Sequence, residues 1–197
     1  MQMVDSQRLK YHNKYSNFLT PQECQDIISI IDRDKDDVPT GSYESTGYYG
    51  LTASYDRYNW LHHEDIKPYS IEERLFNLEC MSDWGYMVTQ CWCNELKIGD
   101  NLPKHYHGSE LNNEALRRYD FYSANIFLGG EYNITWYEDM GEVENSVGDI
   151  HIFSSDLEHE VYENTGSDSR YSIAIDIHPQ WVKQMDNLTR WRISKNV

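Results

Sequence analysis

Two histidines separated by a single residue form the motif with the clearest chemical meaning in this chain. They are His105 and His107, in the segment Asn101–Glu110. If His105 lies on a β-strand, the two-residue period of the strand places His107 on the same face, where both imidazoles can bind one metal ion. A third ligand must come from a distant segment, and His159 stands at the start of a later apolar segment. The pattern predicts a divalent metal site.

A basic residue follows the third histidine by eleven positions. Arg170 and Ser172 lie in the segment Ser169–Ile177, and on a strand they share one face. A charge on a strand made otherwise of core residues must be paired. A guanidinium beside a hydroxyl suits the carboxylate of a small anion. The alternative is an ordinary salt bridge with one of the many carboxylates of the chain.

Short aromatic and β-branched segments after residue 84 must position these side chains. Turns that contain glycine separate the segments. Strands at this spacing favour a closed or double-sheet architecture, such as a jelly roll (double-stranded β-helix). The predicted strands are Tyr86–Ile98, Phe121–Leu128, Glu131–Tyr137, Asp149–Phe153, His159–Tyr162 and Arg170–Ile177.

Two helices are expected before this β-core. Thr20 and Glu23 form a capping box at the start of the first helix, and Ser70 and Glu73 form one at the start of the second. Cys24, Ile27, Ile28 and Ile31 repeat at helical spacing and predict one apolar stripe on the first helix. These helices are expected to pack on the sheet and to do no chemistry.

The composition indicates a folded protein with an acidic surface. Among 197 residues, 39% are hydrophobic, and 33 acidic residues stand against 17 basic ones, for a net charge of −16. Such a charge disfavours nucleic acid and anionic membranes. No segment reads as a signal peptide or a membrane span, so a cytoplasmic location is expected. We expect one domain over residues 1–197, with a helical and loop lead-in at 1–83 and the β-core at 84–180.

The order of these parts resembles the 2-oxoglutarate- and Fe(II)-dependent oxygenases. Those jelly-roll enzymes carry a His-x-Asp/Glu…His metal triad and a basic residue followed by Ser at +2. The resemblance covers about residues 15 to 180 and looks closest to small members encoded by marine bacteriophages. It rests on the entry-helix segment Asn17–Cys24, on His105-x-His107, on Asn125–Gly130, on Gly148–Phe153 with His159, and on Arg170-x-Ser172.

The resemblance implies Fe(II) at the histidines, but the chain departs from the family pattern there. His107 stands where the family has Asp or Glu. Three neutral imidazoles would leave the ion its full two positive charges. Glu110 could instead curl back as an oxygen ligand, although on an uninterrupted strand it would face away from His105. The predicted ligands are His105, His107 and His159, with Glu110 as the alternative.

The resemblance also implies a site for 2-oxoglutarate. Arg170 and Ser172 would anchor its distal carboxylate. Asn125 or Tyr122, which lie on opposite faces of one predicted strand, could hydrogen-bond its keto-acid end. Trp92 and Trp136 are interpreted as core residues rather than walls of this site, and His62, His63, His151 and His178 as structural or surface histidines.

The predicted function is that of a 2-oxoglutarate- and Fe(II)-dependent oxygenase that hydroxylates a peptide or a small molecule. The tyrosine-rich stretch Tyr43–Tyr58 is the first candidate for substrate specificity. One alternative is a jelly-roll module that binds metal or ligand without turnover. Another is a three-histidine dioxygenase that does not use 2-oxoglutarate. The sequence carries no signal for the oligomeric state.

Overall fold

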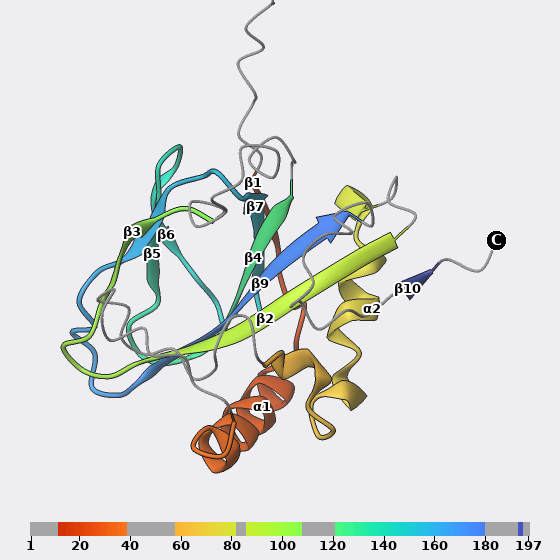
Figure 1. The fold of residues 1–197 in the computed structure, drawn as a ribbon. Coiled ribbons are helices and arrows are strands. Elements are labelled where there is room, and N and C mark those ends of the chain that lie inside the picture. The colour runs from red at the N-terminus through yellow and green to blue at the C-terminus, as the bar shows by residue number, and fades with distance from the viewer. Residues whose placement is uncertain (1–11, 39–57, 82–85, 108–120, 180–192, 195–197) are drawn as a thin grey trace, which may run out of the picture.

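Two antiparallel sheets face each other as a double-stranded β-helix, which confirms the predicted jelly roll (Figure 1). The computed structural model describes residues 12–38, 58–81, 86–107, 121–179 and 193–194. The larger sheet has the strand order β1-β7-β4-β9-β2-β10, and the smaller has β3-β8-β5-β6. The strands are β1 (His12–Tyr15), β2 (Tyr86–Leu96), β3 (Leu102–His105), β4 (Tyr122–Gly129), β5 (Ile134–Tyr137), β6 (Gly141–Glu144), β7 (Ile150–Ser154), β8 (His159–Val161), β9 (Arg170–Pro179) and β10 (Ile193–Ser194).

Each of the six predicted strand segments overlaps one of these strands, with ends that differ by a few residues, but the edge strands β1 and β6 were not predicted. β1 pairs with β7 at one end of the larger sheet, and β6 pairs with β5 at one end of the smaller sheet. Both are four-residue strands with no buried position. A strand that buries neither face needs no apolar alternation, so its sequence gives little signal.

The helices of the described part of the chain lie on one side of the larger sheet (Figure 1). α1 begins with the predicted capping box: the Thr20 hydroxyl accepts from the Glu23 N–H, and the Glu23 carboxylate accepts from the Thr20 N–H. The helices are α1 (Pro21–Asp34), α2 (Ile71–Phe76) and the 3₁₀ helices η2 (Trp60–His62), η3 (Lys67–Tyr69) and η4 (Glu79–Met81).

The capping box predicted for the second helix is wrong. Ser70 does precede α2, but its φ is 52° and its side chain makes no capping bond. Its N–H instead donates to the Lys67 carbonyl at 3.0 Å and closes η3. A left-handed residue between two helices directs its side chain away from the next helical turn, so the sequence pattern alone misled.

The two faces of the larger sheet differ sharply in polarity, and this difference creates the site. On β9, Ile173, Ile175 and Ile177 join the apolar core beneath the helices. The alternate residues Arg170, Ser172, Asp176 and His178 are equally buried, so they must face the smaller sheet. The inner face of the double sheet is therefore lined by buried polar groups, which need partners or a ligand.

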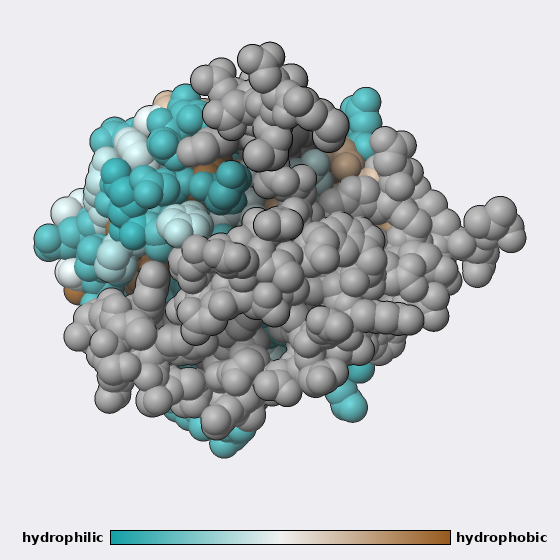
Figure 2. Space-filling model, turned by 45° about the horizontal axis from the view of Figure 1, so that its top comes forward, coloured by the Kyte–Doolittle hydropathy of each residue, from teal (hydrophilic) through white to brown (hydrophobic). Residues whose placement is uncertain are grey.

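The described surface is mainly hydrophilic on the face that Figure 2 shows. Within the described ranges, no helix is long and apolar enough to cross a membrane.

Replacing Glu23 by glutamine is expected to lower the free energy of unfolding by about 1 kcal/mol at neutral pH. Arg74 donates to the Glu23 carboxylate and holds its pKa at about 2. Because the folded-state pKa lies below the usual value, this stabilisation is present at neutral pH and disappears as the pH falls from the usual carboxyl range towards 2. Urea melts of the wild type and the variant should differ at pH 7 and converge near pH 2.

The matched control is Glu73→Gln, which removes an exposed carboxylate from the first turn of α2. Its effect on the free energy of unfolding should stay within about 0.5 kcal/mol. A Glu23→Gln deficit that remains unchanged at pH 2 would contradict the assignment to the ion pair.

Candidate metal centre

Three histidines meet at the end of the smaller sheet. His105 closes β3 and pairs in register with His159, which opens β8, so their rings lie 4.3 Å apart between centroids. His107 lies in a turn just beyond β3, where its N–H donates to the Ser155 carbonyl at 2.8 Å. Candidate ligand atoms of the three histidines all lie within 4.8 Å of one another. The structure thus brings together the three predicted metal ligands.

Backbone carbonyls fix the orientation of two of these rings. Nδ1 of His105 lies 2.8 Å from the Pro103 carbonyl, and Nδ1 of His159 lies 3.0 Å from the Leu157 carbonyl. A carbonyl only accepts, so each Nδ1 carries the proton and each Nε2 keeps its lone pair. Metal-bound histidines are held by such partners. The Nε2 atoms are therefore the ligand atoms on offer.

The third imidazole faces a carboxylate. Nδ1 of His107 lies 2.5 Å from Oδ1 of Asp176, and the Ser123 hydroxyl donates to the same oxygen at 2.8 Å. Burial works to raise the pKa of Asp176, but His107 and Ser123 outweigh it and hold this pKa below its usual range. Asp176 was not among the predicted site residues, because nothing in the sequence shows that β9 brings it beneath His107.

Neutral imidazoles are ready to bind a metal ion at neutral pH. Burial lowers the pKa of His105 to about 4, and it lowers that of His159 well below the ordinary value. The ring of Phe153 packs on the triad from inside, 4.8 Å from His159 and 6.3 Å from His107 between centroids. Three imidazole nitrogens suit Fe(II), Zn(II), Co(II) and similar ions. The donor set therefore fits the iron that the sequence predicted.

The predicted alternative ligand Glu110 lies outside the described residues. Residues 43–57 of the tyrosine-rich stretch also lie outside them. A second group with metal-like spacing consists of Asp34, His63 and Asp65. Arg33 forms ion pairs with both carboxylates of that group. The Arg33 guanidinium already pairs with these carboxylates, so the group is a surface ion-pair cluster.

Arg170 is fully buried against hydroxyl groups instead of a carboxylate. Its Nη1 donates to Ser172 Oγ at 3.2 Å and its Nη2 to Thr135 Oγ1 at 3.0 Å. Its Nε has no hydrogen-bond partner among the described residues, and no described carboxylate forms a salt bridge with it. Burial lowers its pKa to about 10, so the guanidinium stays charged at neutral pH in a site that disfavours charge. The salt-bridge alternative therefore does not hold within the described residues.

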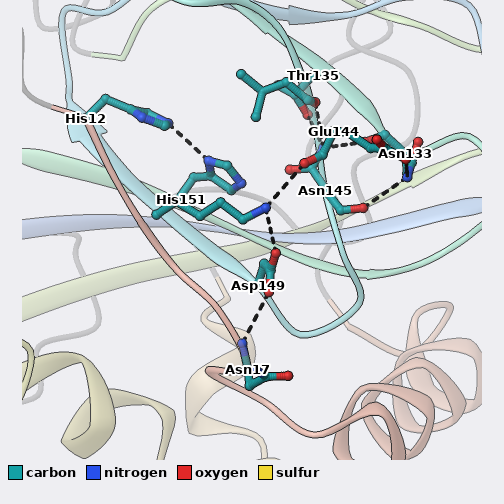
Figure 3. A network of polar contacts seen from close by, with 10 residues as sticks. His12, Asn17, Asn133, Thr135, Glu144, Asn145, Asp149 and His151 are labelled. Carbon is teal, nitrogen blue, oxygen red and sulfur yellow. Dashed lines mark hydrogen bonds and ion pairs between the residues drawn. The ribbon is translucent and has the colours of Figure 1, made fainter.

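The Thr135 hydroxyl adds a hydrogen-bond donor beside Arg170. Its Oγ1 accepts from Arg170. It also accepts from Asn145 Nδ2 at 3.1 Å (Figure 3). Because both neighbours are donors, the Thr135 hydroxyl hydrogen is left to donate elsewhere. The Ser172 hydroxyl also accepts from Arg170, so its hydrogen is likewise left to donate elsewhere. Two hydroxyl hydrogens beside the guanidinium are therefore available to an anion.

A glycine allows the chain to approach Arg170 closely. Gly130 has a φ of 114°, and a Cβ at this position would lie 2.7 Å from the Arg170 Cα. The turn between β4 and β5 can pack against the start of β9 only without a side chain here. Gly130 therefore serves both the turn and the close packing of this turn against Arg170.

Tyr137 bridges the space between the two groups. It lies two residues from Thr135 on the inner face of β5, and its ring is 6.0 Å from that of His159 between centroids. The Tyr137 hydroxyl and Asn125 Oδ1 are buried, and the Asn125 side chain lies close enough to the Tyr137 hydroxyl to lower its pKa. Burial raises the pKa of Tyr137, so its hydroxyl remains a donor.

Of the two residues predicted to bind a keto acid, only Asn125 faces this space. Tyr122 is three residues away on β4, on the opposite face, and packs against the apolar core beneath the helices. The structure contradicts the predicted role of Tyr122. Alternation along the strand separated the two residues correctly, but only the position of the helices shows which face is inside.

Two histidines interpreted as structural or surface residues are buried inside the double sheet. His151 Nδ1 lies 3.0 Å from Nε2 of His12, a pair that Figure 3 shows above Asp149. His178 stacks on Phe121 with the ring centroids 4.4 Å apart. Nε2 of His151 and of His178 has no hydrogen-bond partner among the described residues.

The two tryptophans differ in place. The Trp92 ring lies 5.4 Å from that of His107 between centroids, so it walls the metal centre, contrary to its interpretation as core. Trp136 is half-buried on the outer face of the smaller sheet, where the Lys104 ammonium lies 3.9 Å from its ring centroid, so its interpretation as core is also wrong.

Together, the fold and the site define a double-stranded β-helix with a candidate three-histidine metal centre and a buried arginine that has no carboxylate partner among the described residues. Solved structures with the same fold are 2-oxoglutarate–Fe(II) oxygenases and related enzymes. A Pseudomonas putida prolyl-4-hydroxylase is 13% identical, with a TM-score of 0.59 over 86% of this chain and 92% of that one. No protein-family model matches the chain. No curated protein matches it either.

Two further structures share the fold. The viral collagen prolyl hydroxylase of Paramecium bursaria Chlorella virus-1, solved as a 2-oxoglutarate complex, is 16% identical, with a TM-score of 0.60 over 86% of this chain and 97% of that one. A non-haem α-ketoglutarate-dependent epimerase of nogalamycin biosynthesis is 10% identical, with a TM-score of 0.64 over 86% and 77%. At these identities the comparisons establish the fold, and the chemistry must be argued from the site.

Proposed function

We propose that this protein is a 2-oxoglutarate- and Fe(II)-dependent oxygenase that hydroxylates a peptide or a small molecule. The observation that carries the proposal is Arg170, a buried guanidinium with no carboxylate partner among the described residues, which faces the smaller sheet that carries the histidine triad. A buried charge without a counter-charge is costly. A dianionic ligand that reaches from the metal to Arg170 would remove that cost.

The pocket groups suit the two ends of 2-oxoglutarate. Arg170, Ser172 and Thr135 offer a guanidinium and two hydroxyl hydrogens to the distal carboxylate. Tyr137 and Asn125 are buried polar neighbours of each other, and they can orient the chain of the ligand or its keto-acid end. Fe(II) held by the triad would supply the activation of O₂ that couples oxidation of the keto acid to succinate and CO₂ with hydroxylation of a substrate.

The protein itself keeps water from this space and fixes the ligand geometry. Phe153 and Trp92 pack on the triad, and Tyr137 is fully buried between the two polar ends. In such a site the charge-assisted hydrogen bonds from Arg170 are stronger than they would be in water. Prolyl hydroxylases are among the structures with this fold, so prolyl peptides are the first substrates to test.

His107 favours one second candidate function. A triad without a carboxylate ligand is the donor set of a three-histidine dioxygenase, which would bind iron and ignore 2-oxoglutarate. Arg170 would then hold the substrate. The two functions differ in whether the keto acid binds next to the metal.

An anaerobic titration of the metal-free protein with Fe(II) and then with 2-oxoglutarate tests the proposal. We expect a visible charge-transfer band from the chelated keto acid, and slow succinate formation once O₂ is admitted. Pyruvate, which lacks the distal carboxylate, should bind at least about 100-fold more weakly, because two charge-assisted hydrogen bonds are worth roughly 3 kcal/mol or more. Tight iron binding without a band would favour the three-histidine dioxygenase or a module without turnover. Failure to bind iron would refute the proposal.

A further inference from the structure

The three imidazoles of the candidate metal centre do not have equivalent partners. Nδ1 of His105 and Nδ1 of His159 face neutral backbone carbonyls, whereas Nδ1 of His107 faces the carboxylate of Asp176 at 2.5 Å. The carboxylate of Asp176 therefore lies behind the histidine that replaces the carboxylate of the usual triad.

Asp176 is held in place as firmly as a metal ligand would be. It lies on the inner face of β9, is only 2% exposed, and accepts a second hydrogen bond from Ser123 at 2.8 Å. Ser123 is its register partner on the neighbouring strand β4. A carboxylate fixed between two central strands of the sheet cannot swing away from His107 without breaking that arrangement.

A count of formal charges shows what this carboxylate contributes. Two neutral imidazoles and one carboxylate reduce the charge of a divalent ion from +2 to +1. Three neutral imidazoles leave +2, and Asp176 brings the sum back to +1 from one hydrogen bond farther out. A carboxylate behind a metal-bound histidine also fixes the tautomer and raises the basicity of the ring.

We propose that Asp176 takes over the role of the missing carboxylate ligand: acting through His107, it supplies the negative charge of the metal centre and fixes the ring that binds the ion. Asp176 is thus a positioning residue. The inference rests on the proposed function only in that it requires a metal ion at the triad. It makes the substitution of His107 for a carboxylate compatible with a working site, since the charge is moved and not lost.

Co(II) titration of the metal-free protein, followed by its absorption spectrum and by competition with a chelator, tests the inference without any turnover. Asp176→Asn keeps an oxygen acceptor for His107 and removes only the charge. We expect it to bind Co(II) about 10- to 100-fold more weakly than the wild type, with a shifted ligand-field spectrum. If the wild type bound Co(II) and Asp176→Asn bound it equally tightly, the inference would be overturned while the metal centre stood.

The matched control is Asp149→Asn. Asp149 is also 2% exposed, but its partners are Lys14 at 2.8 Å and the Asn17 N–H, away from the triad (Figure 3). This variant should lose some stability and keep the Co(II) affinity of the wild type. An equal loss of Co(II) affinity in both variants would show a general effect of losing a buried carboxylate, and would also overturn the inference. If the wild type itself bound no Co(II), the metal centre of the proposed function would be wrong.

A change of ligand separates this role from a merely structural one. His107→Glu places a carboxylate on the metal, where it would face Asp176 across the distance that a hydrogen bond now spans. In that background, Asp176→Asn should strengthen Co(II) binding, because it removes a like charge from beside the new ligand. The same substitution thus weakens binding next to His107 and strengthens it next to the glutamate. Loss of affinity in both backgrounds would indicate that Asp176 only supports the fold, and would contradict the proposal.

Discussion

Replacing His159 by alanine is expected to abolish tight metal binding. His159 is 6% exposed and lies at the centre of the triad, with the other two rings 4.3 and 5.1 Å away between centroids. Removing an outer partner of a metal ligand typically costs 10- to 100-fold in affinity, so loss of a ligand itself should cost more than about 100-fold. Isothermal titration with Co(II) measures this loss directly.

His159→Ala should also lose the rise in melting temperature that Co(II) gives the wild type. A ligand that binds only the folded state stabilises it by about 2.7 kcal/mol at a hundred times its Kd. The wild type should therefore melt at a higher temperature with Co(II) than without it, and His159→Ala should show no such shift. His151→Ala is the matched control, because His151 is also fully buried in the β-core but is not part of the triad. A Co(II)-dependent shift that survives in His159→Ala would remove this histidine from the site.

The central strands could be predicted from the sequence because burial imposes a pattern on them. β2, β4 and β9 lie inside the larger sheet, and their apolar positions alternate or run together. β1 and β6 lie at sheet edges and have only half-buried and exposed positions, so no strong apolar pattern marked them. For the same reason the overall fold class was accessible, and the extent of each sheet was not.

The site was predictable only where its residues are close in sequence or share a motif. The spacing of His105 and His107 and the pair Arg170 and Ser172 stand out in one segment each. Asp176 is 69 residues from His107 and could be assigned only from the strand order of the sheet. Thr135 and Tyr137 were recognised as strand residues without a role, because the sequence does not say which strand of the smaller sheet faces Arg170.

Arg170→Met is expected to separate ligand binding from stability. The variant should bind Co(II) like the wild type, because the side-chain hydrogen bonds of Arg170 go to Ser172 and Thr135 and not to the triad. It should bind 2-oxoglutarate at least about 100-fold more weakly, because the charge-assisted hydrogen bonds to the distal carboxylate are lost. Arg170→Lys should lie between the two, since it keeps the charge and loses the planar fork.

The ligand-free Arg170→Met variant is also expected to keep its stability. Burial lowers the pKa of Arg170 to about 10, below its ordinary value, so at neutral pH the folded state bears the cost of holding the charge. An unbranched apolar side chain of similar length removes that cost, and replacing buried ions in this way is often neutral or stabilising. We therefore expect the ligand-free Arg170→Met protein to melt at the same temperature as the wild type or higher.

The matched control for this sign is Arg74→Met. Arg74 is paired with Glu23 and also donates to the Phe18 carbonyl at 3.0 Å, so its loss should destabilise the protein and leave 2-oxoglutarate binding unchanged. The two arginines thus predict opposite results: one variant loses the ligand and keeps stability, and the other loses stability and keeps the ligand. An Arg170→Met protein that unfolded more easily than the wild type but still bound 2-oxoglutarate would mean that this guanidinium serves the fold, and that the anion pocket lies elsewhere.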